Sequence, residues 1–150
     1  MCYNDTRMVR SVEVRIIPMS LDDEEFRGMN IEDVQNKFFR GSLIEIDKGW
    51  YEYGEKGLKA NTGDLLLFQM DNQVIAAAEL EDIMPYSKPT IKGYHGSLVL
   101  NKKSIKVFRP ISKEEMTRYI PIFAGFNQTK QKYYLSEVNI KELMERISNE

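Results

Sequence analysis

Hydrophobic residues along this chain come in short runs of strand length, and two of these runs form the clearest pattern in the sequence. Residues 65–70 (LLLFQM) and 74–80 (VIAAAEL) are joined through Asp71-Asn72, a pair that tolerates the left-handed backbone of a tight turn. The alanines alone would favour a helix, but the connection is too short, so we predict an antiparallel hairpin. The small side chains at 76–78 suit a strongly curved sheet or the close approach of another element.

Three other segments have the pattern of short strands. The alternation of apolar and polar residues from 12 to 17 predicts a strand that stops at Pro18. Residues 98–100 form a short apolar run, and the stretch from 105 to 110 carries lysines between its apolar positions. Together with the hairpin, these segments give about five or six short strands.

Capping residues mark where the first two helices begin. Ser20 is placed to cap a short helix that starts with Asp22, Asp23 and Glu24, because acidic side chains stabilise the positive end of a helix. Asn30 is placed to cap a second helix. The apolar residues of this second helix recur at helical spacing and are expected to lie on the sheet: Ile31, Val34, Phe38 and Phe39.

Two more helices are predicted towards the C-terminus. Ser112 and Glu115 form a capping box that opens a helix reaching about Tyr119 and ending before Pro121. The last helix is expected in the stretch IKELMERI after Asn139. Its apolar face packs on the rest of the chain and consists of Ile140, Leu143, Met144 and Ile147. Strands and long helices do not alternate, so we expect an α+β fold: a small, partly open β-barrel with short flanking α-helices.

Length and composition fit a single domain over residues 1–150, with a flexible N-terminus over residues 1–10. Cys2 is the one cysteine and cannot pair within the chain, which fits a reducing compartment. The sequence contains neither a run of about 18 apolar residues nor the apolar core of a signal peptide. We therefore expect a soluble, cytoplasmic protein with no membrane partner.

The formal net charge of −2 conceals an uneven distribution along the chain. Residues 88–132 hold ten lysines and arginines against two glutamates, a local balance of +8, so the rest of the chain carries −10. Clustered cations attract phosphate backbones, although the same side chains can equally lie on different faces as solvated groups. The favoured phosphate contacts are Lys102, Lys103, Lys106, Arg109, Lys130 and Lys132.

Aromatic and amide residues flank the predicted hairpin and are candidates for a binding pocket. A nucleobase offers two faces that stack on aromatic rings and an edge that needs fixed hydrogen-bond partners. The candidates are Trp50, Tyr51, Tyr53, Gln69, Tyr86, Tyr94, His95 and Asn127. Trp50 also suits a core position that closes one end of a barrel, His95 a solvated loop, and Asn127 a turn.

The order of these motifs resembles the PUA-like superfamily, and most closely its EVE branch. The resemblance runs over roughly residues 11–147, through a strand ending in IIP, a helical excursion, the stretch GDLLLFQMDNQVIAAAEL, IKVFRPI and FNQTKQKYYL. It implies a binding module that holds a modified or flipped base in an aromatic-lined pocket on the barrel. The chain lacks the Gly-x-Lys-x-x-Glu signature of the ASCH branch and carries no nuclease domain, so the ligand's identity stays open.

The sequence offers little for catalysis. His95 is the only histidine, and neither a Gly-x-Ser-x-Gly elbow, a glycine-rich phosphate loop nor a set of His and Cys metal ligands is present. We expect a non-catalytic reader of nucleic acid or of a modified nucleobase, without cofactor or metal. The alternatives are a protein–protein interaction module and a metal-dependent hydrolase that uses carboxylates alone.

Overall fold

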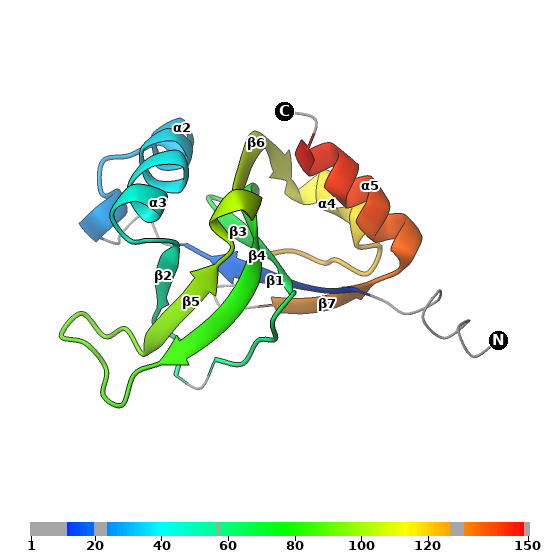
Figure 1. Cartoon of the computed structure of the whole chain (residues 1–150). Coiled ribbons are helices and arrows are strands. Elements are labelled where there is room, and N and C mark those ends of the chain that lie inside the picture. The colour runs from blue at the N-terminus through cyan, green and yellow to red at the C-terminus, as the bar shows by residue number, and fades with distance from the viewer. Residues whose placement is uncertain (1–11, 20–23, 57, 127–130, 149–150) are drawn as a thin grey trace, which may run out of the picture.

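The structure is a computed structural model that describes residues 12–19, 24–56, 58–126 and 131–148 (Figure 1). Four features predicted from the sequence lie outside these ranges. They are the flexible segment 1–10, the helix start at 20–23, the pocket residue Asn127 and the phosphate contact Lys130.

Seven strands form one mixed sheet in the order β2-β5-β4-β3-β1-β7, and β6 pairs with β4 beside this path. The bounds are β1 Val12–Pro18, β2 Trp50–Tyr53, β3 Leu65–Met70, β4 Gln73–Pro85, β5 Gly96–Leu100, β6 Lys106–Ser112 and β7 Gln131–Leu135. Strands β1 and β3 run parallel, and the other pairs are antiparallel. The fold is therefore α+β, as predicted, with more strands than the sequence suggested. The pairings among the described strands leave the sheet unclosed, with β2 and β7 at its ends.

The predicted hairpin is confirmed as β3–β4. Asp71 and Asn72 both have positive φ angles, 52° and 60°, as the two central residues of a type I′ turn require. Strand β4 continues past Leu80, the predicted end, to Pro85. It does so because its second half finds a new partner in β5, which the local pattern does not reveal.

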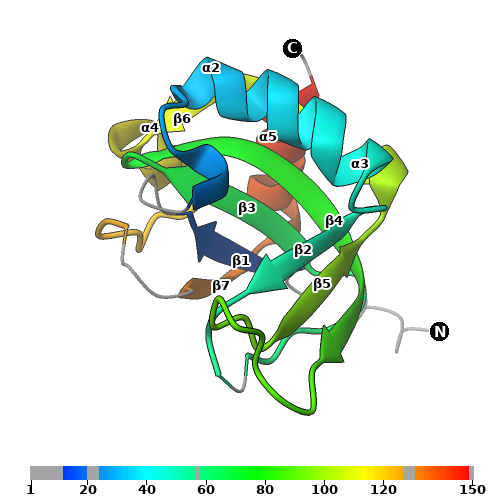
Figure 2. The ribbon, with the colours of Figure 1, turned by 90° about the vertical axis from the view of Figure 1, so that its left-hand side faces the viewer.

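Strand β4 bends across the molecule, and the bend shapes the whole sheet (Figure 2). Its first half pairs with β3 and β6 and its second half with β5, and the register shifts near Ala76 and again before Asp82. Such bulges increase local bending and twist. Ala76, Ala77 and Ala78 are buried at this bend, in agreement with the predicted need for small side chains.

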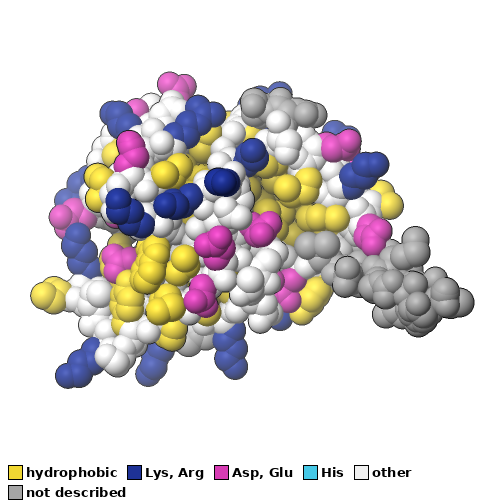
Figure 3. Space-filling model, in the orientation of Figure 1, with side chains coloured by type: hydrophobic (Ala, Val, Ile, Leu, Met, Phe, Trp, Pro, Cys, Tyr) yellow, Lys and Arg dark blue, Asp and Glu magenta, His cyan; other side chains and the backbone are white. Residues whose placement is uncertain are grey.

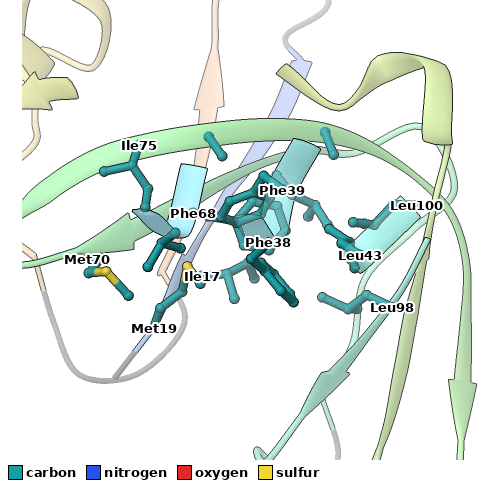
Figure 4. Packing of buried hydrophobic residues seen from close by; sticks show 14 of the residues in the cluster. Ile17, Met19, Phe38, Phe39, Leu43, Phe68, Met70, Ile75, Leu98 and Leu100 are labelled. Carbon is teal, nitrogen blue, oxygen red and sulfur yellow. The ribbon is translucent and has the colours of Figure 1, made fainter. Parts of the chain in front are cut away.

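The chain between β1 and β2 forms one helical segment, which lies across the sheet. It consists of α2 (Ile31–Asp33), the π-helix η3 (Val34–Ser42) and α3 (Leu43–Glu45), and the short 3₁₀ helix η2 (Glu24–Phe26) precedes it. The predicted cap is confirmed: the Asn30 side chain accepts a hydrogen bond from the Asp33 N–H at 2.8 Å, and the Asp33 carboxylate accepts from the Asn30 N–H at 3.3 Å. Figure 4 shows the side chains that this segment places against the sheet, among them Phe38, Phe39 and Leu43.

The opposite face of the sheet is covered by α4 (Lys113–Tyr119) and α5 (Glu137–Ser148), and a further 3₁₀ helix, η4 (Lys102–Ser104), joins β5 to β6. The Ser112 side chain accepts from the Glu115 N–H at 3.1 Å, so the predicted start of α4 is confirmed. Because helices cover both faces, every residue of β3 is buried, which explains a continuous apolar run in place of alternation.

Helix α5 packs its predicted face on the sheet except at one position. Leu143 and Ile147 are fully buried, whereas Met144 is 39% exposed, so the prediction for Met144 is wrong. The contact is a narrow strip centred on Leu143 and Ile147, and Met144 falls at its border with solvent. Within the described ranges, no helix has the length and apolar character needed to cross a membrane.

Candidate functional site

A cavity of about 1070 Å³ lies where the sheet fails to close. One wall is the end of β1, with Ile17 and Pro18, and the other is β2 with the segment that follows it. Phe26 of η2 and Phe38 of the helical segment contribute apolar surface between these walls. The bend of β4 therefore shapes the cavity, because it carries β2 towards the end of β1, and these two strands do not pair within the part of the chain that the structure describes.

The cavity follows the open edge of β2. Side chains along a strand point alternately to opposite faces, yet all four residues of β2 line the cavity. On the paired side, the Leu100 N–H donates to the Gly49 carbonyl and the His95 N–H donates to the Tyr53 carbonyl, both at 2.8 Å. In an antiparallel ladder this alternation directs the N–H and C=O of Glu52 away from β5, towards the open edge.

Five of the predicted pocket residues line this cavity: Trp50, Tyr51, Tyr53, Tyr86 and Tyr94. The Trp50 side chain is 42% exposed, so the alternative of a core residue closing a barrel does not apply to it. The Tyr51 ring packs against two phenylalanine rings, with its centroid 4.9 Å from that of Phe68 and 6.1 Å from that of Phe38. The rings come from β2 and from the connection between β4 and β5.

A small hydrogen-bond group lies beside these rings. The Tyr86 hydroxyl donates to Oε2 of Glu52 at 3.0 Å and lies 2.5 Å from Oγ of Ser97, which is buried. Burial raises the pKa of Tyr86, the hydrogen bond with Ser97 lowers it, and the Glu52 carboxylate raises it again, for a net increase. Tyr86 therefore stays protonated at neutral pH and keeps its hydrogen to donate.

Tyr53 has an unusual position over β5. Its ring covers Gly96, the residue paired with it across the strands, where a side chain would leave no room. Burial raises the pKa of the Tyr53 hydroxyl, and the nearby Tyr86 raises it further. The missing side chain at Gly96 thus leaves the space that the end of the Tyr53 ring occupies.

Changing Gly96 to alanine is expected to displace the Tyr53 ring. The added Cβ would lie 2.7 Å from the Met84 carbonyl oxygen and would overlap the Tyr53 hydroxyl. We expect the free energy of unfolding, measured with urea, to fall by about 1–3 kcal/mol, as for other overpacked sites. The control is Gly41→Ala in the helical segment, where the new Cβ meets one atom at 3.4 Å and helix propensity favours alanine. Equal stability of Gly96→Ala and the unchanged protein would contradict this account of the site.

Two predicted pocket residues lie outside the cavity. Gln69 belongs to β3, which is covered on both faces, and it is 7% exposed. His95 lies in the connection between β4 and β5, where its backbone groups bond to Tyr53 and Tyr86 but its side chain is not part of the lining.

The described phosphate candidates do not line the cavity either. The lining does not include Lys102 and Lys103 of η4 or Lys106 of β6, although the stem of Lys102 lies against Gly49, next to Trp50. Figure 3 shows basic side chains over α3 and η4, above hydrophobic side chains over β2 and β5.

The last two phosphate candidates have different neighbours from Lys102. The carbonyl of Arg109 accepts a hydrogen bond from Arg146 of α5 at 2.7 Å, which places Arg109 next to the C-terminal helix. Lys132 lies on β7 with its Nζ 5.4 Å from the centre of the Tyr134 ring. The fold therefore disperses the basic segment that the sequence suggests, because β6 and β7 attach to different parts of the sheet.

Acidic side chains outnumber basic ones in the lining, which the sequence did not indicate. The charged residues that line the cavity are Glu25, Asp47, Glu52, Glu55, Lys48 and Lys92. Only the position of Glu52 could have been anticipated from neighbouring residues, because it lies between Tyr51 and Tyr53 in the stretch WYEY. The others come from separate segments that only the fold brings together.

Among the residues that the structure describes, no three histidine, cysteine or carboxylate side chains gather as a metal site requires. A scan of the chain against protein-family models and a search of the curated proteins each give no match. The chemistry of the cavity is therefore the basis for inferring what it binds.

Proposed function

We propose that this chain is a non-catalytic reader that binds a nucleobase, free or within a nucleic acid, in the aromatic cavity. The observation that carries the proposal is the convergence of Trp50, Tyr53, Tyr86 and Tyr94 on one cavity at an open sheet edge. Aromatic stacking contributes about 1–3 kcal/mol per base. Two or more rings around one base would supply most of the affinity of a small ligand.

Polar groups beside the rings match the second need of a base, which is hydrogen bonding along its edge. The Tyr86 hydroxyl, Ser97 and the Glu52 carboxylate lie together, and the backbone of Glu52 faces the open edge of β2. A few fixed polar groups in a largely apolar cavity are typical of sites that orient a planar ligand. Donors and acceptors are both present, so the site can distinguish one base edge from another.

We further propose that the fold is PUA-like and of the EVE type. The bent, unclosed sheet and the helical excursion after β1 support this assignment. The Gly63-Asp64 entry to β3 supports it as well: Asp64 is buried and accepts from Nε of Arg15 at 2.7 Å, which ties β3 to β1. The assignment explains why an aromatic cavity would be present at this position.

Titrating nucleosides and short oligonucleotides tests the proposed function, with the fluorescence of Trp50, the only tryptophan, as the signal. We expect quenching with at least one nucleoside, because a stacked base lies against the indole. By calorimetry, Trp50→Ala should then weaken binding at least about fivefold, the lower end of the stacking contribution. Tyr134→Ala, which removes an exposed ring from β7, should leave the affinity unchanged.

A protein-binding role is the second candidate, and the open edge of β2 favours it. An extended peptide can add to such an edge as a further strand, through backbone hydrogen bonds.

Free nucleosides separate the two candidates, since they cannot form a strand. Absence of quenching with every nucleoside and oligonucleotide would remove the nucleobase proposal. Tighter binding of oligonucleotides at low salt than at high salt would indicate phosphate contacts with basic side chains near Lys102.

A further inference from the structure

We infer that the base bound in this cavity carries a positive charge, as bases methylated at a ring nitrogen do. The inference rests on the proposed function and specifies its ligand. The relevant class is a nucleoside unit whose ring is cationic at neutral pH, such as 1-methyladenosine or 3-methylcytidine. Three properties of the cavity lead to this class: the charge of its lining, the electronic character of its rings, and the location of its carboxylates.

The lining favours a cation because of its charge. Glu25, Asp47, Glu52 and Glu55 line the cavity, against Lys48 and Lys92. A concave site lined mainly by one sign of charge concentrates ligands of the opposite sign. A neutral base gains nothing from this excess of acidic groups, whereas a cationic base does.

The rings favour a cation for a separate reason. The face of an aromatic ring is electron-rich and attracts a cation held over it, with tryptophan the strongest of the side chains. Trp50 is partly exposed and available to a ligand, and Tyr53, Tyr86 and Tyr94 line the same space. A flat cationic ring therefore combines stacking with the attraction of a charge to these faces.

The hydrogen-bond group places a carboxylate at the rings. The Tyr86 hydroxyl donates to Oε2 of Glu52 at 3.0 Å, so the carboxylate is held next to an aromatic ring that lines the cavity. A positive ring stacked there would lie close to the negative charge of Glu52. The stem of Lys102 lies against Gly49, next to Trp50 of the lining, so we expect a phosphate attached to such a base to reach the Lys102 ammonium group.

Pairs of nucleosides that are isomers as neutral molecules provide the test, because at neutral pH one member of each pair holds an additional proton and is therefore cationic. At neutral pH 1-methyladenosine is cationic and N6-methyladenosine is neutral, and 3-methylcytidine and 5-methylcytidine differ in the same way. We expect the cationic isomer of each pair to bind at least tenfold more tightly, which corresponds to about 1.4 kcal/mol. The preference for 1-methyladenosine should disappear when the pH is raised until this nucleoside loses its proton.

A matched pair of variants assigns the effect to the cavity. Glu52→Gln keeps the size of the side chain and an oxygen for Tyr86 but removes the charge, so the preference should fall at least threefold. Glu142→Gln removes a charge from the exposed side of α5 and should not change it. Equal or tighter binding of the neutral isomers, or a preference unchanged in Glu52→Gln, would overturn the inference and leave the nucleobase proposal intact. Failure of all nucleosides to bind would overturn both.

Discussion

Changing Asp64 to alanine is expected to lower the free energy of unfolding by about 3 kcal/mol, because the change leaves a buried arginine without its main partner. Arg15 and Asp64 are 4% and 6% exposed. The Asp64 carboxylate accepts from Nε of Arg15 at 2.7 Å and from the N–H of Asn61 at 2.8 Å, so both bonds are lost. Broken buried ion pairs cost about 3–5 kcal/mol. We expect a cost at the lower end of this range because Glu13 still contacts Arg15 after the change.

A double-mutant cycle separates the pair from its surroundings. Arg15→Met and Asp64→Ala should each destabilise strongly in urea denaturation, while the double variant should lose clearly less than the two losses added together, because no buried charge from the pair remains uncompensated. The control is Glu81→Ala on the exposed side of β4, with an expected change within about 0.5 kcal/mol. Additive losses in the double variant would show that the two side chains act independently.

Changing Phe39 to alanine is expected to cost about 3–5 kcal/mol, as for other large aromatic residues removed from a core. Phe39 is fully buried, with its ring centroid 5.0 Å from that of Phe38 and 5.1 Å from that of Phe68. The same two rings support Tyr51 at the cavity, so we also expect weaker ligand binding in the folded variant.

Thermal or urea unfolding measures the cost at Phe39, and calorimetry measures the binding. Tyr134→Ala is the matched control, since it also removes an aromatic ring but from a side chain that is 61% exposed. Its stability should change by no more than about 0.5 kcal/mol. A loss below about 1 kcal/mol for Phe39→Ala would mean that the core closes around the vacated space, contrary to the behaviour expected of a close-packed interior.

Features that depend on neighbouring residues were predictable from the sequence. The turn at Asp71-Asn72, the cap at Asn30 and the start of α4 at Ser112 each follow from local backbone chemistry. Features that depend on residues far away in the chain could not be predicted from the sequence. Strand β2 is a short aromatic stretch that becomes a strand only by pairing with β5, and Met144 is exposed because of how α5 is rotated against the sheet.

The candidate site also has one feature that the sequence predicts and one that only the fold reveals. Aromatic residues on either side of a hairpin were correctly expected to lie near one another, since β2 and the β4–β5 connection flank it. The acidic lining was not foreseen, because Glu25, Asp47 and Glu55 belong to three different segments. Charge summed along a sequence segment says little about charge on a surface, as the separation of Lys102 from Lys132 shows.

The position of β1 within the sheet has a consequence for synthesis of the protein. Val14 pairs on one side with Leu65 and on the other with Tyr133, so the first of the described strands to be synthesised is completed by the last of them. Until residues 131–135 emerge, one edge of β1 stays available to incorrect partners. Contacts between such distant residues also slow folding, so the nascent chain spends a comparatively long time with this apolar strand unprotected.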